Sequence, residues 1–246
     1  MKFPVDSYDL KARYTPALIV SLPVLIMLWT CFYHETETIS KIVGGILSAA
    51  ILYFISMLIR ALGKKVEPGL WESWGGAPST QIVLWKNDKI GDGLKQKYHE
   101  IVRQDLDLPM PTKEEEQADP EKAAKQIEDV FKRVKGVIRK YDQKGLWSIA
   151  NAEYGFSRNL YGSRQLYLIL SISCLIISSA FLWKQFSNLV LVGFIILCLN
   201  LAGCIFFSWF LLPDYTKQVG FRYADHSWES YYNIAEERIQ KKQGGE

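Results

Sequence analysis

The chain has 246 residues, of which 49% are hydrophobic and 22% are charged, and its formal net charge is +3. This near balance excludes a protein that binds nucleic acid directly through a concentrated basic face. The four cysteines form no CxxC pair and no cluster with the three histidines, so we expect neither a metal site nor a cofactor.

Four apolar segments dominate the chain, and they come in two pairs. The first pair covers residues 17–33 and 42–59, and the second covers residues 166–183 and 189–212. A helix that crosses a bilayer needs roughly 20 mostly apolar residues. No small-residue cleavage site follows the first segment, so we expect it to remain as an anchor. The pattern predicts an all-α membrane protein with four transmembrane helices in two hairpins.

Basic residues mark one end of each predicted span. They follow the second span, precede the third and follow the fourth: Arg60, Lys64, Lys65, Arg158, Arg164, Lys217 and Arg222. Because such residues flank the cytoplasmic ends of membrane helices, we place both termini in the cytoplasm. The predicted parts are a cytoplasmic segment 1–16, a hairpin 17–62, a mostly helical cytoplasmic domain 63–165, a hairpin 166–212 and a cytoplasmic tail 213–246. We take the membrane to be a bacterial inner membrane.

Small and polar residues inside the spans predict where helices pack or line a pore. Small side chains let helix backbones approach closely in lipid. Asn200 is the one strongly polar side chain near the middle of a span, and its amide must find a partner. That partner is either another helix of the same chain, or a second subunit or a polar pore. The predicted packing or pore residues are Gly44, Gly45, Ser48, Ala49, Asn200 and Gly203.

The predicted cytoplasmic domain contains several helical signals. Asp119 suits a helix N-cap and Pro120 a first helical position. The apolar stripe that follows predicts a helix of about 22 residues, roughly 33 Å long: Ile127, Val130, Val134, Val137 and Tyr141, widened by Phe131 and Ile138. Residues 89–104 are also amphipathic, and residues 109–119 are interpreted as a linker. Residues 81–85 fit either a short strand or a helix start.

Two aromatic or basic regions are candidate ligand sites. Trp71 and Trp74 follow the second span; we expect them to pack near the membrane face, and an aromatic ligand platform is the alternative. Arg158 and Asn159 precede the third span, where interfacial anchoring and binding of a phosphate-like anion are both open. In the tail, Asp225 or Ser227 is expected to cap a last helix ending near Gln240.

Motifs of common catalytic chemistry are absent. There is no phosphate-binding loop, no GxSxG elbow and no HExxH. The run Asp225-His226-Ser227 is interpreted as a helix start, because adjacent residues rarely converge as a triad. We therefore expect no catalytic residues and no enzyme activity.

Three function classes remain open. The arrangement of spans is similar to that of small bacterial multi-pass proteins that act as membrane-disrupting effectors in anti-phage defence. This similarity of organisation implies an oligomer whose cytoplasmic domain senses a small anionic ligand or a protein partner and rearranges the membrane helices. The alternatives are a scaffold that anchors a soluble partner, and an interfacial enzyme acting on lipid or nucleotide through Trp74, Arg158 and Asp225.

Overall fold

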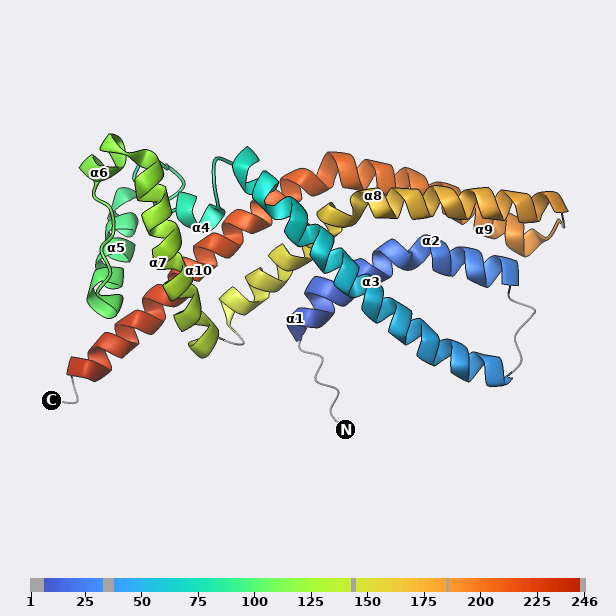
Figure 1. The fold of residues 1–246 in the computed structure, drawn as a ribbon, viewed down its shortest axis with the longest axis horizontal. Helices are drawn as coiled ribbons and strands as arrows, with labels where there is room; N and C mark the ends of the chain where they lie inside the picture. Colours follow the sequence, from blue (N-terminus) through green and yellow to red (C-terminus); the bar gives the residue numbers. More distant parts are fainter. Residues whose placement is uncertain (1–6, 33–37, 143–144, 185, 244–246) are drawn as a thin grey trace. The chain divides into compact units, whose positions relative to one another are not determined.

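The computed structural model describes residues 7–32, 38–142, 145–184 and 186–243, with side chains for 8–31, 50–142, 145–184 and 186–243. This part of the chain is all-helical, with 88% helix and no strands (Figure 1). The elements are α1 (Ser7–Asp9), η1 (Leu10–Tyr14), α2 (Thr15–Phe32), α3 (Thr38–Ser73), α4 (Pro78–Gln81), α5 (Asp92–Leu106), α6 (Lys113–Ala118), α7 (Pro120–Tyr141), α8 (Leu146–Lys184), α9 (Asn188–Phe206), η3 (Phe207–Leu211) and α10 (Leu212–Gln243).

Contacts divide the chain into two compact units. Unit 1 comprises Met1–Glu67 and Gly155–Thr216, and unit 2 comprises Pro68–Tyr154 and Lys217–Glu246. Three helices, α3, α8 and α10, contribute residues to both units. The predicted boundaries at 62–63, 165–166 and 212–213 lie within 11 residues of the ends of these segments, yet none of them coincides with a helix end.

Unit 1 contains the apolar helices. Three helical stretches are long and apolar enough to cross a membrane, namely Leu10–Cys31, Leu146–Lys184 and Asn188–Gln243, and they indicate a membrane protein. They overlap the predicted spans 17–33, 166–183 and 189–212. The predicted span 42–59 lies in α3, whose first residues fall outside the described side chains, so a fourth span stays a prediction.

The described surface of unit 1 is apolar and its interior is packed with small side chains. Phe54 and Leu199 are 70% and 68% exposed, as expected of side chains that face lipid. The buried cluster joins α2, α3, α8, the end of α9 and the start of α10: Ala17, Val20, Ile59, Leu160, Tyr167, Cys204 and Leu212. An exposed apolar surface around a buried core is the arrangement of a helical unit that sits in a bilayer.

Unit 2 is organised around α7 and Trp228. Asp119 caps α7 as predicted, since its carboxylate accepts the Lys122 N–H at 3.0 Å, and the helix has the expected 22 residues. Its stripe is buried, or at Val137 partly buried, except at the end, where Tyr141 is exposed and the prediction is wrong. Trp228 of α10 is fully buried against Tyr98 and Phe131, and its indole N–H donates to the Ser79 carbonyl at 2.8 Å.

Two predicted boundaries in unit 2 are wrong. The predicted linker 109–119 contains α6, which Thr112 and Glu115 begin with a reciprocal capping box. In the tail no helix begins at Asp225 or Ser227, because α10 runs unbroken from Leu212 to Gln243. The Ser227 hydroxyl donates to the Tyr223 carbonyl one turn earlier, as a serine inside a helix does.

The predicted segment 81–85 is neither a strand nor a helix start: Gln81 is the last residue of α4, and residues 82–85 form turns that lead to a backbone stretch bonded to side chains. The buried Glu116 carboxylate accepts the N–H groups of Trp85 and Lys86 at 2.7 and 2.9 Å. The buried Lys95 ammonium donates to the carbonyls of Trp85, at 3.0 Å, and of Asn87. These two charged side chains replace the hydrogen bonds that a helix or strand would supply.

Candidate functional site

A hydrogen-bonded polar cluster in unit 1 surrounds Asn200. The Asn200 amide N–H donates to the Tyr167 hydroxyl at 2.8 Å, and the Ser171 hydroxyl donates to the Asn200 carbonyl oxygen at 3.3 Å. Asn200 comes from α9 and its two partners come from α8. The predicted interhelical bond within one chain is therefore present, and roles in a subunit contact or a pore stay predictions.

The cluster lines one side of a hollow of about 280 Å³. Gly203 lies on its wall, and a side chain added there would meet no atom within 4 Å. The π-helical segment η3 follows directly and supplies Phe207 and Ser208, in keeping with the frequent position of π-helical turns beside functional sites. Two predicted packing or pore residues, Asn200 and Gly203, thus share one cavity.

Small hydroxyl side chains fill much of the described interior of unit 1. They are buried while the outward side chains are large and apolar, and they are Ser21, Thr30, Ser56, Ser157, Ser163, Ser171, Ser178 and Ser208. Several donate to carbonyls of their own helix, such as Ser21 to Ala17 at 2.7 Å and Ser163 to Asn159 at 2.9 Å. A hydroxyl bonded in this way satisfies its polar group without a charge, which suits a membrane interior.

Among the described residues of unit 1, helices pack closely at glycines that the small-residue prediction did not include. A Cβ on Gly162 of α8 would lie 2.6 Å from the backbone nitrogen of Gly63 of α3. Gly193 of α9 is equally tight against Thr30 of α2. The predicted residues Gly44, Gly45, Ser48 and Ala49 lie in α3, but their side-chain surroundings lie outside the described residues.

Arg158 and Asn159 are buried and bonded inside unit 1. Arg158 Nη1 donates to Glu67 Oε1 at 2.7 Å, and Arg158 Nη2 donates to Asn159 Oδ1 at 3.1 Å. The Asn159 amide N–H donates to the Ala12 carbonyl at 2.7 Å. The geometry ties α8 to α3 and to η1, and the predicted role in anion binding or anchoring stays a prediction.

Trp71 and Trp74 are half-buried in unit 2. The Trp71 indole N–H donates to the Tyr154 hydroxyl at 2.8 Å, and Trp74 packs against Gly220 of α10. Tyr154 itself stacks on Tyr223 with 5.6 Å between the ring centroids. Both tryptophans therefore have packing partners, and a role as a ligand platform stays a prediction.

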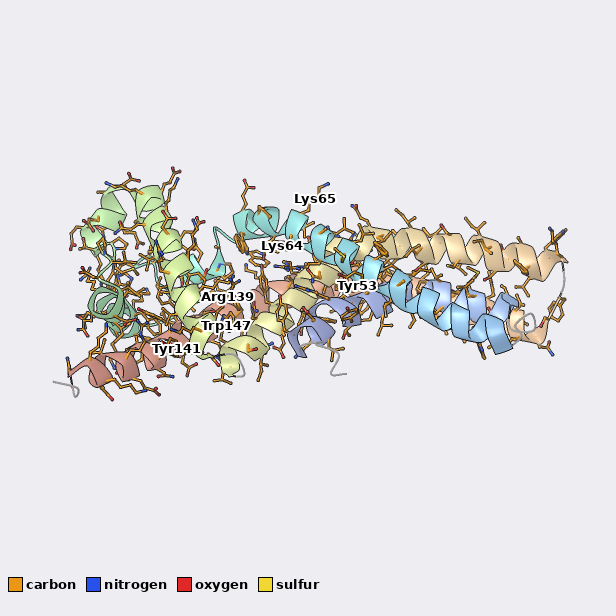
Figure 2. The ribbon with its side chains drawn as sticks, turned by 60° about the horizontal axis from the view of Figure 1, so that its bottom comes forward. Tyr53, Lys64, Lys65, Arg139, Tyr141 and Trp147 are labelled. Atoms are coloured by element: carbon orange, nitrogen blue, oxygen red, sulfur yellow. The ribbon has the colours of Figure 1, made fainter. Side chains whose placement is uncertain are left out.

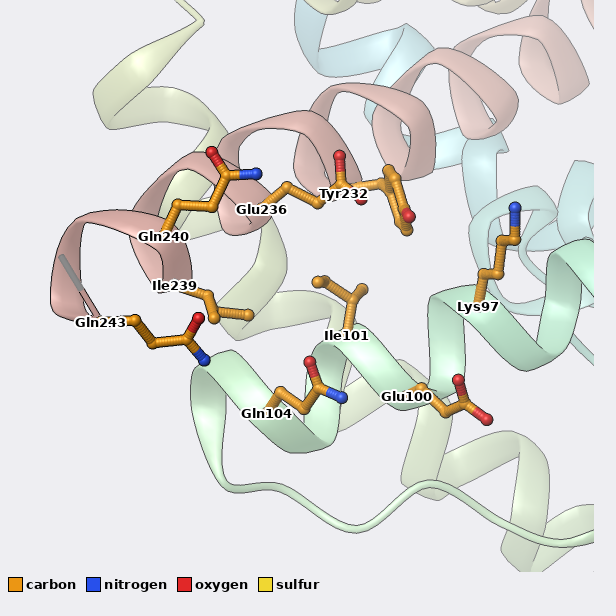
Figure 3. A pocket seen from close by; sticks show the side chains of 9 residues that line it. All are labelled: Lys97, Glu100, Ile101, Gln104, Tyr232, Glu236, Ile239, Gln240 and Gln243. Carbon is orange, nitrogen blue, oxygen red and sulfur yellow. The ribbon is translucent and has the colours of Figure 1, made fainter.

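A groove that sequence reasoning missed lies between α5 and α10 of unit 2. Its volume is about 430 Å³. Figure 3 shows Ile101, Ile239 and Tyr232 around its centre. Polar side chains surround them: Lys97, Glu100, Gln104, Glu236, Gln240 and Gln243. Because α5 and α10 are more than 100 residues apart in the chain, no local motif marks this groove.

The remaining candidates for chemistry are the histidine, cysteine and acidic side chains and the run Asp225-His226-Ser227. Among the described residues, no three His, Cys, Asp or Glu side chains converge as metal ligands. His226 of the Asp225-His226-Ser227 run lies 3.3 Å from Glu229, while the Ser227 hydroxyl is bonded to Tyr223. These contacts belong to the surface and packing of α10.

His99 makes the stability of unit 2 sensitive to acid. Its Nε2–H donates to the Val83 carbonyl at 3.0 Å, and burial lowers its pKa below the ordinary value of 6.5. Below pH 6.5 the unfolded chain binds the proton more readily than the folded chain does, so stability is lost as the pH falls from 6.5 toward the lower folded pKa. We expect the melting temperature to drop more between pH 7 and 5 in the wild type than in His99→Gln. Equal slopes in the wild type and in His99→Gln would contradict the assignment.

Comparison with known proteins gives this chain no relative. No family model, no curated protein and no solved structure matches it. The fold places it in the broad class of helical membrane proteins, on the strength of its three apolar helices.

Proposed function

We propose that the chain is an oligomeric multi-pass membrane effector without enzyme activity. In this proposal four helices cross a bacterial inner membrane as two hairpins, and the termini and unit 2 are cytoplasmic. A protein partner or small anionic ligand binds unit 2 and rearranges the spans, and the membrane becomes permeable. Membrane disruption of this kind would serve anti-phage defence.

The observation that carries the proposal is the polar interior of unit 1. Buried hydroxyls and the Asn200 cluster lie inside helices that carry large apolar side chains outside. Most of these hydroxyls are bonded to a nearby group, and a side-chain rotation would offer them to water in a rearranged oligomer. No charged side chain would have to cross the hydrocarbon for this change, and moving such a charge is costly.

A scaffold that anchors a soluble partner is the second candidate. The groove between α5 and α10 favours it, because a concave surface with Ile101, Ile239 and Tyr232 inside a polar rim suits recognition of another molecule. A scaffold would use the same groove without any change in the spans.

Expression in bacteria with Asn200→Leu tests the effector function. A potential-sensitive dye and a DNA-binding dye would be read together, at matched membrane levels. We expect the wild type to depolarise the cells and Asn200→Leu to reduce depolarisation at least about tenfold, because leucine leaves no amide for a hydrated path. Cys198→Leu is the matched control, since Cys198 is exposed on the same helix.

Two outcomes would contradict the proposed function. Wild-type cells that keep their potential and grow normally would favour the scaffold. Depolarisation by Asn200→Leu as strong as that by the wild type would show that the polar cluster is not part of a permeation path.

A further inference from the structure

The two ends of α7 in unit 2 carry opposite net charges. Beside its beginning the exposed acidic residues Glu114, Glu115, Asp119 and Glu121 outnumber the exposed lysines Lys122 and Lys125 by two, whereas Arg133 and Arg139 are exposed along its second half. The charges in the middle pair among themselves, since Lys132 lies 2.7 Å from Asp129 and 3.6 Å from Glu128. Among the described residues, Arg133, Arg139 and Glu121 take part in no ion pair.

The helix dipole explains part of this pattern but not all of it. Acidic residues at a helix beginning and basic residues at its end are each favoured by the dipole. The dipole does not explain the large apolar side chains beside the basic end, where Tyr141, Leu146 and Ile149 are 53%, 55% and 53% exposed. Figure 2 shows Arg139 and Tyr141 on the last turns of α7. Exposed apolar side chains that gather beside unpaired charges mark an interaction surface.

We propose that unit 2 associates head to tail with a second copy of itself, with the basic end of α7 in one copy bound to the acidic end of α7 in the next. This inference rests on the proposed function, which requires an oligomer. We call the two surfaces the basic end (Arg133, Arg139, Tyr141, Leu146 and Ile149) and the acidic end (Glu114, Glu115, Asp119 and Glu121). The Lys140 ammonium lies 5.2 Å from the Tyr141 ring centroid and adds to the positive charge, whereas the Arg238 guanidinium, 5.9 Å from the same ring, is paired with Asp105 at 2.9 Å.

Charge decides between the possible occupants of the basic end. Two basic ends facing each other across a two-fold axis would repel, so a symmetric dimer through this surface is disfavoured. The acidic end of another copy is complementary to it and is present at the same concentration. The two ends of α7, a helix of 22 residues, are roughly 33 Å apart, so one copy can hold two neighbours at once.

Membrane insertion limits what such a contact can build. A head-to-tail contact forms a ring if its rotation closes and an open filament if it does not. All copies inserted by the same route share one orientation relative to the bilayer, so successive contacts run in the membrane plane. A ring in that plane holds several copies of unit 1 in one patch of membrane.

A charge-swap experiment on the full-length protein, both in liposomes and in detergent, tests this contact. One variant carries Glu114→Lys and Glu121→Lys, so both of its ends are positive. The other carries Arg133→Glu and Arg139→Glu, so both of its ends are negative. Self-association is measured by energy transfer between labelled copies in liposomes and by light scattering after gel filtration. The matched controls reverse exposed charges elsewhere in unit 2, away from the groove: Glu72→Lys with Asp88→Lys, and Lys86→Glu with Lys241→Glu.

We expect each swapped variant alone to associate at least about tenfold more weakly than the wild type, and the controls to associate normally. An equimolar mixture of the two swapped variants should regain association in one-to-one stoichiometry, because each positive end then meets a negative end. Raising the salt from 50 to 500 mM should weaken wild-type association, as expected of exposed charges.

Specific outcomes would overturn the contact. The contact is rejected if each swapped variant associates as strongly as the wild type. It is also rejected if the mixture of the two variants fails to regain association. Loss of liposome binding by the Arg133→Glu, Arg139→Glu variant with association unchanged would assign the basic end to anionic lipid. If association changes with the charge swaps as expected but the cells keep their membrane potential, the contact is supported and the proposed function is rejected.

Discussion

Replacing Gly162 by leucine is expected to prevent unit 1 from folding stably. A Cβ at this position would lie 2.6 Å from the Gly63 nitrogen and 2.7 Å from the Leu62 carbonyl carbon, both of them backbone atoms of α3. Neither atom can rotate away, so α3 and α8 would have to separate. We expect a loss of about 3 kcal/mol or more, the upper part of the range for overpacked sites. For a chain of this size that corresponds to a fall of about 10 °C in melting temperature.

Detergent-solubilised protein, followed by thermal unfolding and gel filtration, measures this effect. Gly203→Leu is the matched control, because Gly203 is also a helical glycine of unit 1 and a Cβ added there would meet no atom within 4 Å. By helix propensity alone leucine should favour both helices over glycine by roughly 1 kcal/mol. A Gly162→Leu protein as stable as Gly203→Leu would show that α3 and α8 do not cross in contact at this position.

Local signals in the sequence predict the helices of unit 2 where one residue sets the boundary. Asp119 followed by Pro120 fixes the start of α7, because capping needs only the neighbouring backbone. The same reasoning is wrong at Asp225 and Ser227. Polar residues that suit a cap also occur inside long helices, and the buried Trp228 and Tyr231 keep α10 continuous through this region. At Asp225 and Ser227, tertiary packing determines that the helix continues, and such packing cannot be recognised from the neighbouring residues in the sequence.

The candidate site also has one feature that the sequence predicts and others that depend on how the helices pack. Asn200 stands out in the sequence because a lone amide inside an apolar segment must be bonded. Its partners Tyr167 and Ser171 depend on the register in which α8 and α9 pair, and several serines along α8 would serve equally well. The ion pair of Arg158 joins residues 91 positions apart. From the sequence, Arg158 could be placed only relative to the membrane, because no local signal identifies Glu67 as its partner.

The Arg158–Glu67 pair gives the second large effect. The two side chains are 9% and 15% exposed, and their charged atoms are 2.7 Å apart. Removing one partner of a buried pair leaves the other charge without compensation, which costs about 3–5 kcal/mol. We therefore expect Arg158→Met alone to lower the melting temperature strongly. The double variant Glu67→Met with Arg158→Met should be more stable than Arg158→Met, because no buried charge remains.

Thermal unfolding of the two single variants and the double variant completes the cycle. Lys64→Met is the matched control, since Lys64 is an exposed cation of the same unit and surface substitutions usually change stability by less than about 0.5 kcal/mol. Inorganic phosphate added to the wild type should leave its melting temperature unchanged, because Glu67 already neutralises the guanidinium. A phosphate-dependent rise that Arg158→Met removes, together with additive effects of the two single substitutions, would instead make Arg158 an anion-binding residue. Together, the variants of the cycle distinguish two roles for Arg158: a buried ion pair that joins α8 to α3, and a binding site for an anionic ligand.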